Sequence, residues 1–219
     1  MLTMKTILRR LPSLLFAGVC IVAGAGCALR APLQIAAVEV KIIPESQWGG
    51  TPADSSGART HTISRITLHH QGETFPRGKD PAQYLRDLQR WSRATKKWID
   101  VPYHYAIDLD GNIYQGRDIA FAGDTNTAYD PAGHALIEVV GNHDVTEPNT
   151  AQLDAVVALM TLLAANYAVP LDSIRGHRDY ARDTVCPGKN LYRYLENGYF
   201  RDRVRDNLAK RQQGSRWGS

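Results

Sequence analysis

The sequence predicts a single α/β domain with a central mixed β-sheet flanked by helices. Short segments rich in β-branched residues alternate with segments whose apolar residues recur at helical spacing. Residues 135–140 (Ala-Leu-Ile-Glu-Val-Val) are almost all apolar, which is typical of a strand inside a sheet. The chain has 219 residues, 43% of them hydrophobic, which suits one globular domain plus a targeting segment.

The first half of this domain is predicted to contain a strand, a helix and a hairpin. The strand covers residues 63–69, and Asp80 followed by Pro81 begins the helix. The hairpin joins residues 101–109 to residues 112–116 through an Asp-Gly turn. Helical spacing places Tyr84, Leu88 and Trp91 on one face of the helix, and alternation places Val101, Tyr103, Tyr105, Ile107 and Leu109 on one face of the hairpin.

The second half of the domain is also predicted to alternate between strands and helices. After the apolar strand at 135–140, Asn149 or Thr150 caps the longest helix, which runs to about Tyr167 and is apolar on nearly every side. Such a helix is expected to be covered on more than one face. Residues 173–177 form another short strand, and a final helix begins at about Leu191.

Composition divides the chain into four segments. We expect residues 1–27 to be an export signal, residues 28–60 an irregular lead-in, residues 61–200 the functional domain and residues 201–219 a helical tail. The signal has the usual order: Lys5, Arg9 and Arg10 precede an apolar run that ends in small residues. The protein is therefore expected to be exported to the periplasm or cell envelope.

The end of the signal leaves two alternatives. Gly26-Cys27 resembles a lipoprotein cleavage point, and an acylated Cys27 would anchor the protein to a membrane. However, Gly24 stands where lipoprotein signals usually carry a larger aliphatic residue. Cleavage downstream of Cys27, which would release a soluble protein, stays equally open.

The net charge gives no reason to expect a nucleic-acid partner. The chain has 26 basic and 22 acidic residues, a formal net charge of +4. Three of the basic residues and none of the acidic ones fall within residues 1–26, so the rest carries 23 against 22. The excess of basic residues therefore belongs mainly to the export signal.

Cysteine usage singles out one residue. Cys20 lies inside the signal and Cys27 at its edge, which leaves Cys186 as the single cysteine of the domain. A disulfide within the domain is therefore excluded, and metal ligation or nucleophilic chemistry would explain the residue. His69 and His177 end two predicted strands, and two histidines with one cysteine are an accepted zinc ligand set. The alternative is two core or surface histidines and an incidental cysteine.

Five segments occur in the order that a known superfamily has them. They are 66–70 (Ile-Thr-Leu-His-His), 98–105 (Trp-Ile-Asp-Val-Pro-Tyr-His-Tyr), 110–117 (Asp-Gly-Asn-Ile-Tyr-Gln-Gly-Arg), 176–179 (Gly-His-Arg-Asp) and 184–188 (Thr-Val-Cys-Pro-Gly). From about Trp48 to Tyr194 the chain resembles the zinc amidases that include phage-lysozyme-type amidases and peptidoglycan recognition proteins. The resemblance implies a zinc ion in a surface cleft and hydrolysis of the amide between N-acetylmuramic acid and L-alanine. It implies peptidoglycan or muropeptides as substrates, and we expect a monomer.

The resemblance also implies roles for individual residues. His69, His177 and Cys186 fall on the three zinc ligands. Tyr103, Thr184 and Glu138 fall on catalytic positions, Glu138 as the group that handles protons. A glutamate on an apolar strand facing a cleft is partly desolvated, which raises its pKa and suits proton transfer. The alternatives are a water-facing edge-strand residue for Glu138, a sheet aromatic for Tyr103 and a loop cap for Thr184.

Other polar residues give weaker expectations. Arg117 and Asn126 are candidate groove contacts, although a surface arginine without a role is commoner. His61, His70, His104, His134 and His143 are expected to be surface or hydrogen-bonded histidines.

Two competing functions stay open. One is a cysteine hydrolase with Cys186 as nucleophile and His177 as base. The other is a peptidoglycan-binding module without catalysis. Binding-only members of the superfamily typically lose a zinc ligand, whereas all three candidates are present here, which favours catalysis.

Overall fold

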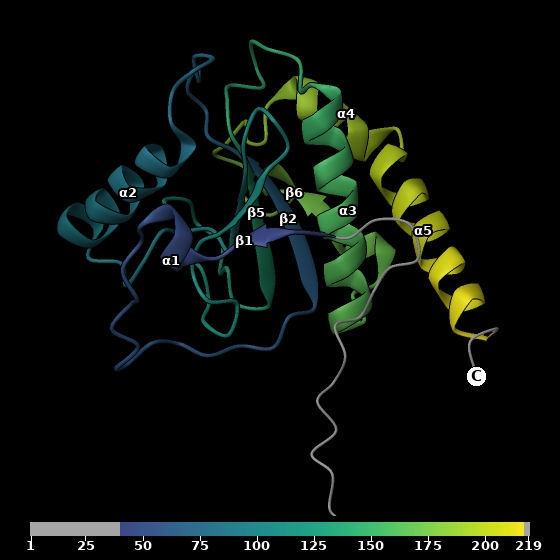
Figure 1. The fold of residues 1–219 in the computed structure, drawn as a ribbon, viewed down its shortest axis with the longest axis horizontal. Coiled ribbons are helices and arrows are strands. Elements are labelled where there is room, and N and C mark those ends of the chain that lie inside the picture. Colours follow the sequence, from purple (N-terminus) through teal and green to yellow (C-terminus); the bar gives the residue numbers. More distant parts are fainter. Residues whose placement is uncertain (1–39, 217–219) are drawn as a thin grey trace, which may run out of the picture. The chain divides into compact units, whose positions relative to one another are not determined.

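Six strands of the described chain, residues 40–216 of the computed structural model, form one mixed sheet in the order β1-β4-β3-β5-β2-β6 (Figure 1). β3 and β4 pair antiparallel, and every other pair of neighbours is parallel. The predicted fold class is therefore confirmed. The strands are β1 (Ile42–Ile43), β2 (Arg65–His70), β3 (Tyr105–Ile107), β4 (Ile113–Gln115), β5 (His134–Val139) and β6 (Ile174–Gly176).

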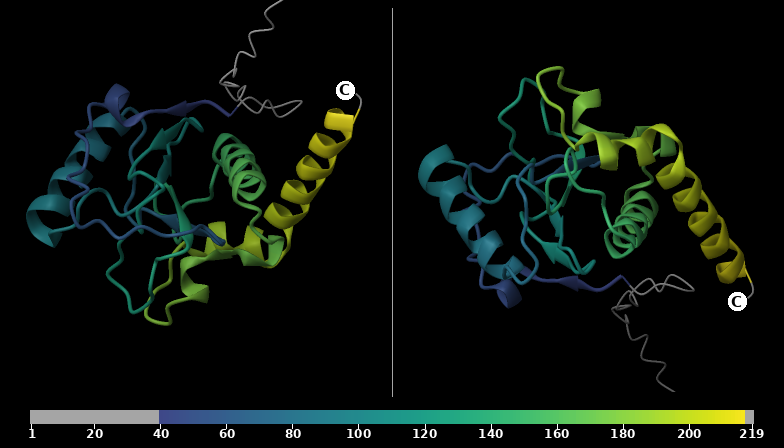
Figure 2. Two further views of the ribbon diagram at one scale, coloured as in Figure 1. Left: turned by 90° about the horizontal axis from the view of Figure 1, so that it is seen from below. Right: turned by 90° about the horizontal axis from the view of Figure 1, so that it is seen from above.

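Helices cover both faces of this sheet. α3 and α5 lie on one side, and α1 and α2 lie on the other, in all the views of Figures 1 and 2. No helix within residues 40–216 is long and apolar enough to cross a membrane. The helices are α1 (Glu45–Trp48), α2 (Pro81–Trp91), α3 (Thr150–Tyr167), α4 (Lys189–Glu196) and α5 (Tyr199–Arg216).

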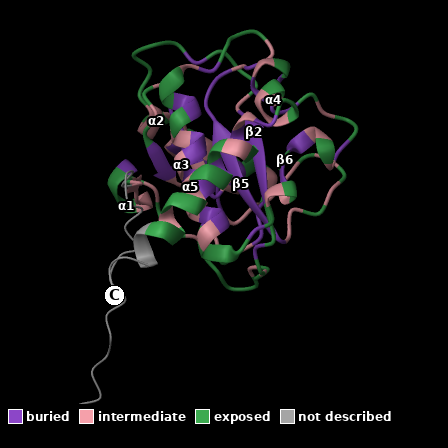
Figure 3. Ribbon diagram, turned by 90° about the vertical axis from the view of Figure 1, so that its right-hand side faces the viewer, coloured by how far each residue is buried: buried purple, intermediate pink, exposed green. Residues whose placement is uncertain are grey.

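The alternation of side chains along the strands decides which residues enter the core. Ile66 and Leu68 of β2 and Ile137 of β5 are fully buried in the main core, between the sheet and helices α3 and α5. Figure 3 shows β2 and β5 coloured as buried strands. Because successive side chains point to opposite faces, His69 and Glu138 lie on the face that α2 covers. The sheet thus separates the main core from the polar residues of interest.

β5 is an interior strand, as its apolar sequence predicts. It lies between β3 and β2, and all six of its residues are buried. Glu138 is 1% exposed, so its interpretation as a water-facing edge residue is wrong. In the parallel register of β2 and β5, His69 pairs with Glu138.

The longest helix begins and ends close to the predicted residues. The Asn149 side chain accepts a hydrogen bond from the Gln152 backbone, and the Gln152 side chain accepts one from the Asn149 backbone. This capping box satisfies backbone groups that would otherwise lack partners at the start of α3. The sheet lies on one side of α3 and α5 on another, which confirms that more than one face is covered.

Several sequence-based expectations need correction. The helix predicted from Leu191 onward is two helices, α4 and α5, which separate at Asn197 and Gly198. The segment 28–60 is not irregular throughout its described part, because β1 pairs with β4 and α1 buries Trp48 against α2 and the sheet. The α5 residues Phe200 and Val204 are fully buried, so α5 belongs to the main core. The export signal, including Cys27, lies outside the described residues.

The predicted hairpin is also shorter than expected. β3 begins only at Tyr105, after a bend that contains Pro102. The bend reverses the alternation, so Tyr105 and Ile107 pack against the main core while Tyr103 lies on the opposite side, beside His69. The prediction that these tyrosines share one face is therefore wrong.

His104 makes the fold sensitive to acid. The buried ring accepts a hydrogen bond from the Leu136 backbone N–H and donates one to the Phe121 carbonyl, each 2.9 Å long. Burial lowers the pKa of His104 to about 3. The unfolded chain therefore binds a proton below about pH 6.5 that the folded chain resists, so stability falls as the pH drops from about 6.5 towards 3.

We expect a His104→Asn variant to show a weaker acid dependence than the wild type. This one histidine contributes up to about 1.4 kcal/mol per pH unit to that slope. Urea unfolding at pH 7 and at pH 5 measures it in both proteins. Equal loss of stability in both between these two pH values would contradict the assignment.

Candidate metal centre and groove

The three predicted metal ligands meet at one edge of the sheet. His69 lies near the end of β2, His177 directly follows β6, and Cys186 lies in the loop before α4. β2 and β6 are parallel neighbours, so their carboxyl ends lie at the same edge. One ligand atom from each of the three residues lies within 4.8 Å of the others, and all three residues are buried.

The loop that carries Cys186 is held against β2. The Cys186 sulfur accepts a hydrogen bond from the His70 backbone N–H at 3.4 Å and lies 3.6 Å from His69 Nδ1. Gly188 then passes very close to the loop after β5, where an added Cβ would come within 2.5 Å of the His143 carbonyl carbon. Its φ of +84° also favours glycine, so this position requires a residue without a side chain.

Burial sets the protonation state of the three candidates. Burial lowers the pKa of His69 well below its usual value and that of His177 to about 4, so both rings are neutral at pH 7. Burial raises the pKa of the Cys186 thiol to about 12. A thiol of this kind is a poor nucleophile, which argues against the cysteine-hydrolase alternative.

The same three residues fit a zinc ion. Neutral imidazoles are the form that binds metals, and a nearby cation favours the thiolate form of a buried cysteine. The 3.6 Å between His69 Nδ1 and the Cys186 sulfur is a separation that two ligands of one tetrahedral zinc ion can have. Two histidines and one cysteine leave a fourth position of a tetrahedral zinc open, as in catalytic sites.

Thr127 supports this centre from the loop between β4 and β5. Its hydroxyl lies 2.6 Å from His177 Nε2 and 2.8 Å from the Thr125 hydroxyl. A partner on the second ring nitrogen fixes the orientation of a ligand histidine. The sequence analysis did not identify Thr127, because a threonine in a loop carries no signal of its contact with a residue 50 positions away.

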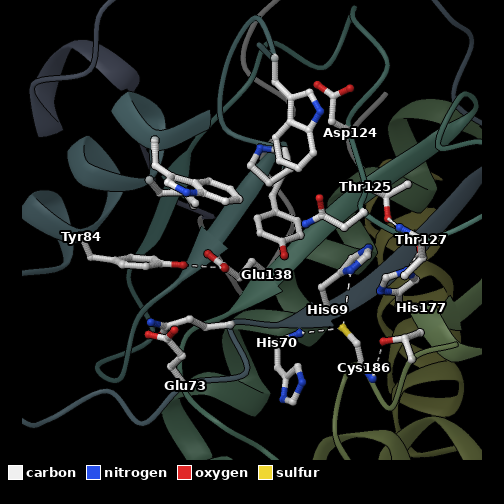
Figure 4. A pocket seen from close by; sticks show the side chains of 18 of the residues that line it. His69, His70, Glu73, Tyr84, Asp124, Thr125, Thr127, Glu138, His177 and Cys186 are labelled. Atoms are coloured by element: carbon white, nitrogen blue, oxygen red, sulfur yellow. Dashed lines mark hydrogen bonds between the residues drawn. The ribbon is translucent and has the colours of Figure 1, made fainter. Parts of the chain in front are cut away.

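Glu138 lies beside this centre and is held by a tyrosine (Figure 4). Its Oε1 accepts a 2.7 Å hydrogen bond from the Tyr84 hydroxyl, while its Oε2 is buried without a partner among the described residues. Burial raises the pKa of Glu138 to about 7, and the Tyr84 hydrogen bond opposes this rise. The result is a carboxyl group that changes charge near neutral pH and has one free oxygen.

Tyr103 and Thr184 also line this cavity, as their family positions imply. The ring of Tyr103 lies 5.1 Å from that of His69, centroid to centroid. Burial raises the pKa of Tyr103 well above its usual value, so its hydroxyl stays protonated and can donate a hydrogen bond. The Thr184 hydroxyl accepts a bond from the Cys186 backbone N–H at 3.1 Å. Their catalytic roles stay predictions.

The cavity extends from the metal candidates along α2 and has a volume of about 580 Å³. Tyr84, Leu88 and Trp91 form the α2 side of it, whereas Leu85 and Gln89 are the buried residues of that helix. The face that helical spacing singles out is therefore the groove face. The residues that line the cavity on its other sides include Gln71, Glu73, Trp98, Pro102, Asp124, Thr125 and Asn126.

Two weaker expectations have different outcomes. Asn126 lines the cavity, as suggested. Arg117 does not, because its guanidinium is 2% exposed and donates to the carbonyl oxygens of Val101, Ala122 and Asp100 and to Asp124. Arg117 therefore connects the hairpin to the neighbouring loops, and neither the groove interpretation nor the surface interpretation is correct.

The five remaining histidines are mostly structural. Each makes at least one hydrogen bond through its ring, and all except His61 are buried. This confirms the hydrogen-bonded interpretation, and four of the five are buried rather than at the surface.

The family of the chain follows from comparison with known proteins. A sequence profile described as N-acetylmuramoyl-L-alanine amidase matches residues 59–189, more than half of the chain. This chain belongs to that amidase family. The matched range contains His69, His177 and Cys186, and the match confirms the resemblance inferred from the five sequence segments.

Similarity to individual proteins supports the same family assignment. Peptidoglycan recognition protein 1 of Mus musculus is 30% identical over 179 residues, which cover 78% of this chain and 94% of the relative. The N-acetylmuramoyl-L-alanine amidase of Mus musculus is 28% identical over 160 residues, 70% of this chain and 30% of that longer protein. The crystal structure of Drosophila peptidoglycan recognition protein SD has a TM-score of 0.64 at 25% identity and covers 72% of this chain and 94% of that one. These family relations support peptidoglycan binding or amidase activity.

If the three donors hold a metal, the purified protein should contain about one zinc per chain. We expect Cys186→Ser to lose most of it, because an alcohol is a much poorer zinc ligand than a thiolate. Elemental analysis after dialysis measures the metal content. Val185→Ala is a matched control, since this neighbour in the same loop is 57% exposed. Full zinc content in Cys186→Ser would contradict the assignment.

Proposed function

We propose that this protein is a zinc-dependent N-acetylmuramoyl-L-alanine amidase. It would hydrolyse the amide between N-acetylmuramic acid and L-alanine in peptidoglycan or its fragments. The observation that carries the proposal is the convergence of His69, His177 and Cys186 in the cavity that also contains the buried Glu138. Some relatives in this family bind peptidoglycan without cleaving it. The presence of all three candidate ligands and a buried carboxyl group in one cavity therefore favours catalysis over binding alone.

His69, His177 and Cys186 would hold the zinc ion. When bound, zinc supplies Lewis acidity, which lowers the pKa of water and polarises a carbonyl group. The neutral rings of His69 and His177 need lose no proton to bind it, whereas Cys186 must release one. Thr127 holds the ring of His177 in place during this process.

Glu138 would handle the protons of the reaction. Its Oε2, which has no partner among residues 40–216, accepts a proton from the attacking water, and Tyr84 holds the other oxygen. The carboxyl group then delivers this proton to the leaving amine. The protonated hydroxyl of Tyr103 donates a hydrogen bond to the carbonyl oxygen as negative charge develops there, and the hydroxyl of Thr184 is the second candidate donor.

A solved relative supports the substrate class. The human peptidoglycan recognition protein IBETAC has been solved in complex with glycosamyl muramyl pentapeptide, with a TM-score of 0.62 and 25% identity to this chain. That complex covers 71% of this chain and 94% of the relative. A ligand of this kind contains both the sugar and the peptide on either side of the amide that we propose is cleaved.

Replacement of Glu138 by glutamine separates catalysis from binding. We expect the variant to fold and to retain zinc but to lose turnover by ~10²–10⁴-fold, as is usual when a general base is removed. Mass spectrometry of digested muropeptides measures turnover, and elemental analysis measures zinc. Glu147→Gln is the control, because this exposed residue pairs with Arg193 away from the cavity.

Three outcomes are informative when the wild type is also assayed after removal of its metal. A zinc-loaded wild type without turnover would show a binding module. Full activity in metal-free protein would refute the zinc proposal. Near wild-type turnover of Glu138→Gln would make Glu138 structural, with Tyr103 and Thr184 as the next candidates for the base.

The Tyr84–Glu138 hydrogen bond predicts a pH effect. Turnover should rise with pH as Glu138 loses its proton. A bound cation lowers the pKa of this carboxyl group, so the rise should occur at a lower pH than the pKa of the metal-free protein indicates. Tyr84→Phe removes a hydrogen bond that favours the carboxylate, worth about 1.5–3 kcal/mol. We expect the acid limb of kcat against pH to move upward by about one pH unit or more, with turnover recovering at high pH.

The control for this variant is Tyr105→Phe, which removes a hydroxyl on the opposite face of the sheet. Its profile of kcat against pH should match that of the wild type. A Tyr84→Phe profile that falls equally at every pH would show that Tyr84 contributes only to stability or packing.

A further inference from the structure

Two tryptophans form an exposed aromatic wall in the cavity. Trp91 is the last residue of α2, and Trp98 follows seven positions later. Their rings pack edge to face with centroids 5.9 Å apart at 85°, and both line the cavity together with Leu88. Trp91 is 42% exposed, although a tryptophan of a folded protein is usually well buried. We refer to Trp91, Trp98 and Leu88 as the aromatic shelf.

The backbone between the two tryptophans is unusual. Ser92–Lys96 form a π-helical turn, and Lys97 then adopts a left-handed conformation with φ of 60°. The Trp98 N–H bonds back to the Ser92 carbonyl at 3.1 Å, which brings the second ring against the first. π-helical turns and positive φ in a residue other than glycine cost free energy and are frequent at functional sites.

A lysine supports the shelf from outside the cavity. The Lys96 ammonium lies 5.5 Å from the Trp91 ring centre and 5.6 Å from that of Trp98. Lys96 is not among the residues that line the cavity. The cation–π contacts therefore stabilise the pair of rings and leave their groove side available to a ligand.

The charge of the cavity indicates what kind of ligand fits this shelf. Among the described residues, no lysine or arginine lines the cavity, whereas four carboxylates do: Glu73, Asp87, Glu138 and Asp124, the last of which pairs with Arg117. Asp87 lies four residues before Trp91, one turn away on the same helix. An anionic segment of a peptide stem is thus disfavoured beside the shelf. An uncharged pyranose fits, because its apolar face can cover an indole while its hydroxyls donate to carboxylates.

We propose that the aromatic shelf binds a sugar ring of the glycan portion of the substrate. This inference rests on the proposed amidase function for the position of the reacting bond, but sugar binding itself can be measured without catalysis.

The first experiment measures binding alone. The peptide-free disaccharide N-acetylglucosaminyl-N-acetylmuramic acid, with its lactyl carboxyl group as the uncharged methyl ester, is titrated into wild type, Trp91→Ala, Trp91→Tyr and Tyr167→Ala by calorimetry, with and without zinc. Loss of one aromatic stacking contact should weaken the Kd of Trp91→Ala roughly three- to tenfold, with Trp91→Tyr intermediate. Tyr167 is a matched control, because it is 38% exposed and does not line the cavity. Thermal unfolding checks that each variant is folded.

The second experiment compares two substrates that share the same stem peptide. One carries the disaccharide on its lactyl group, and the other carries the lactyl group alone. Trp91→Ala should raise KM for the first substrate and leave kcat and the kinetics on the second unchanged. An equal KM increase on both substrates would show that the shelf contacts the peptide, which would overturn the proposal.

The outcomes separate this inference from the proposed function. Absence of disaccharide binding to the wild type, or equal binding by wild type and Trp91→Ala, would overturn the sugar site even if the protein is an active amidase. Shelf-dependent disaccharide binding by a protein without turnover would support the sugar site and refute the amidase.

Discussion

The parallel pairing of β2 with β5 and β6 is the constraint on which the candidate site depends. Parallel strands end at the same edge of a sheet, so this pairing brings His69 and His177 together across more than a hundred residues of sequence. The register of β2 and β5 also places Glu138 opposite His69. A shift of one residue in either strand would turn these side chains into the main core. The buried apolar residues that alternate with them therefore fix the chemistry as well as the fold.

Burial of these polar groups is costly, and the protonation states show how the protein accommodates it. The two candidate histidines are neutral, the pKa of the Cys186 thiol is raised to about 12, and that of Glu138 is raised to about 7. His69 Nε2 and Glu138 Oε2 have no partner within the described chain. A buried donor or acceptor without a partner is destabilising by about 1–3 kcal/mol. A substrate that donates a hydrogen bond to Glu138 Oε2 would remove part of this cost, so the same burial that weakens the fold would favour the ligand.

Much of this arrangement could be predicted from the sequence, because it depends on local patterns. The apolar run at 135–140 identified an interior strand, Asn149 identified the start of α3, and the lone Cys186 directed attention to a metal site. What could not be predicted depends on contacts between distant segments. The bend at Pro102 that turns Tyr103 towards His69 and the burial of Arg117 between loops leave no periodic signal. The roles of Thr127 and Tyr84 depend in the same way on partners 50 and 54 residues away.

α2 shows why periodicity alone misleads at a groove. Tyr84, Leu88 and Trp91 recur at helical spacing, and the same pattern describes a helix packed on a core and a helix that lines a cavity. In this protein the core side of α2 consists of Leu85 and Gln89, and the more aromatic side faces the groove. Tyr84 and Trp91 are seven residues apart, about 10 Å along the helix axis. One rigid helix therefore fixes the separation between the carboxyl group that would move protons and the shelf that we propose binds sugar. Catalysis and substrate selection would then share a single structural element, and its position on the sheet would set both.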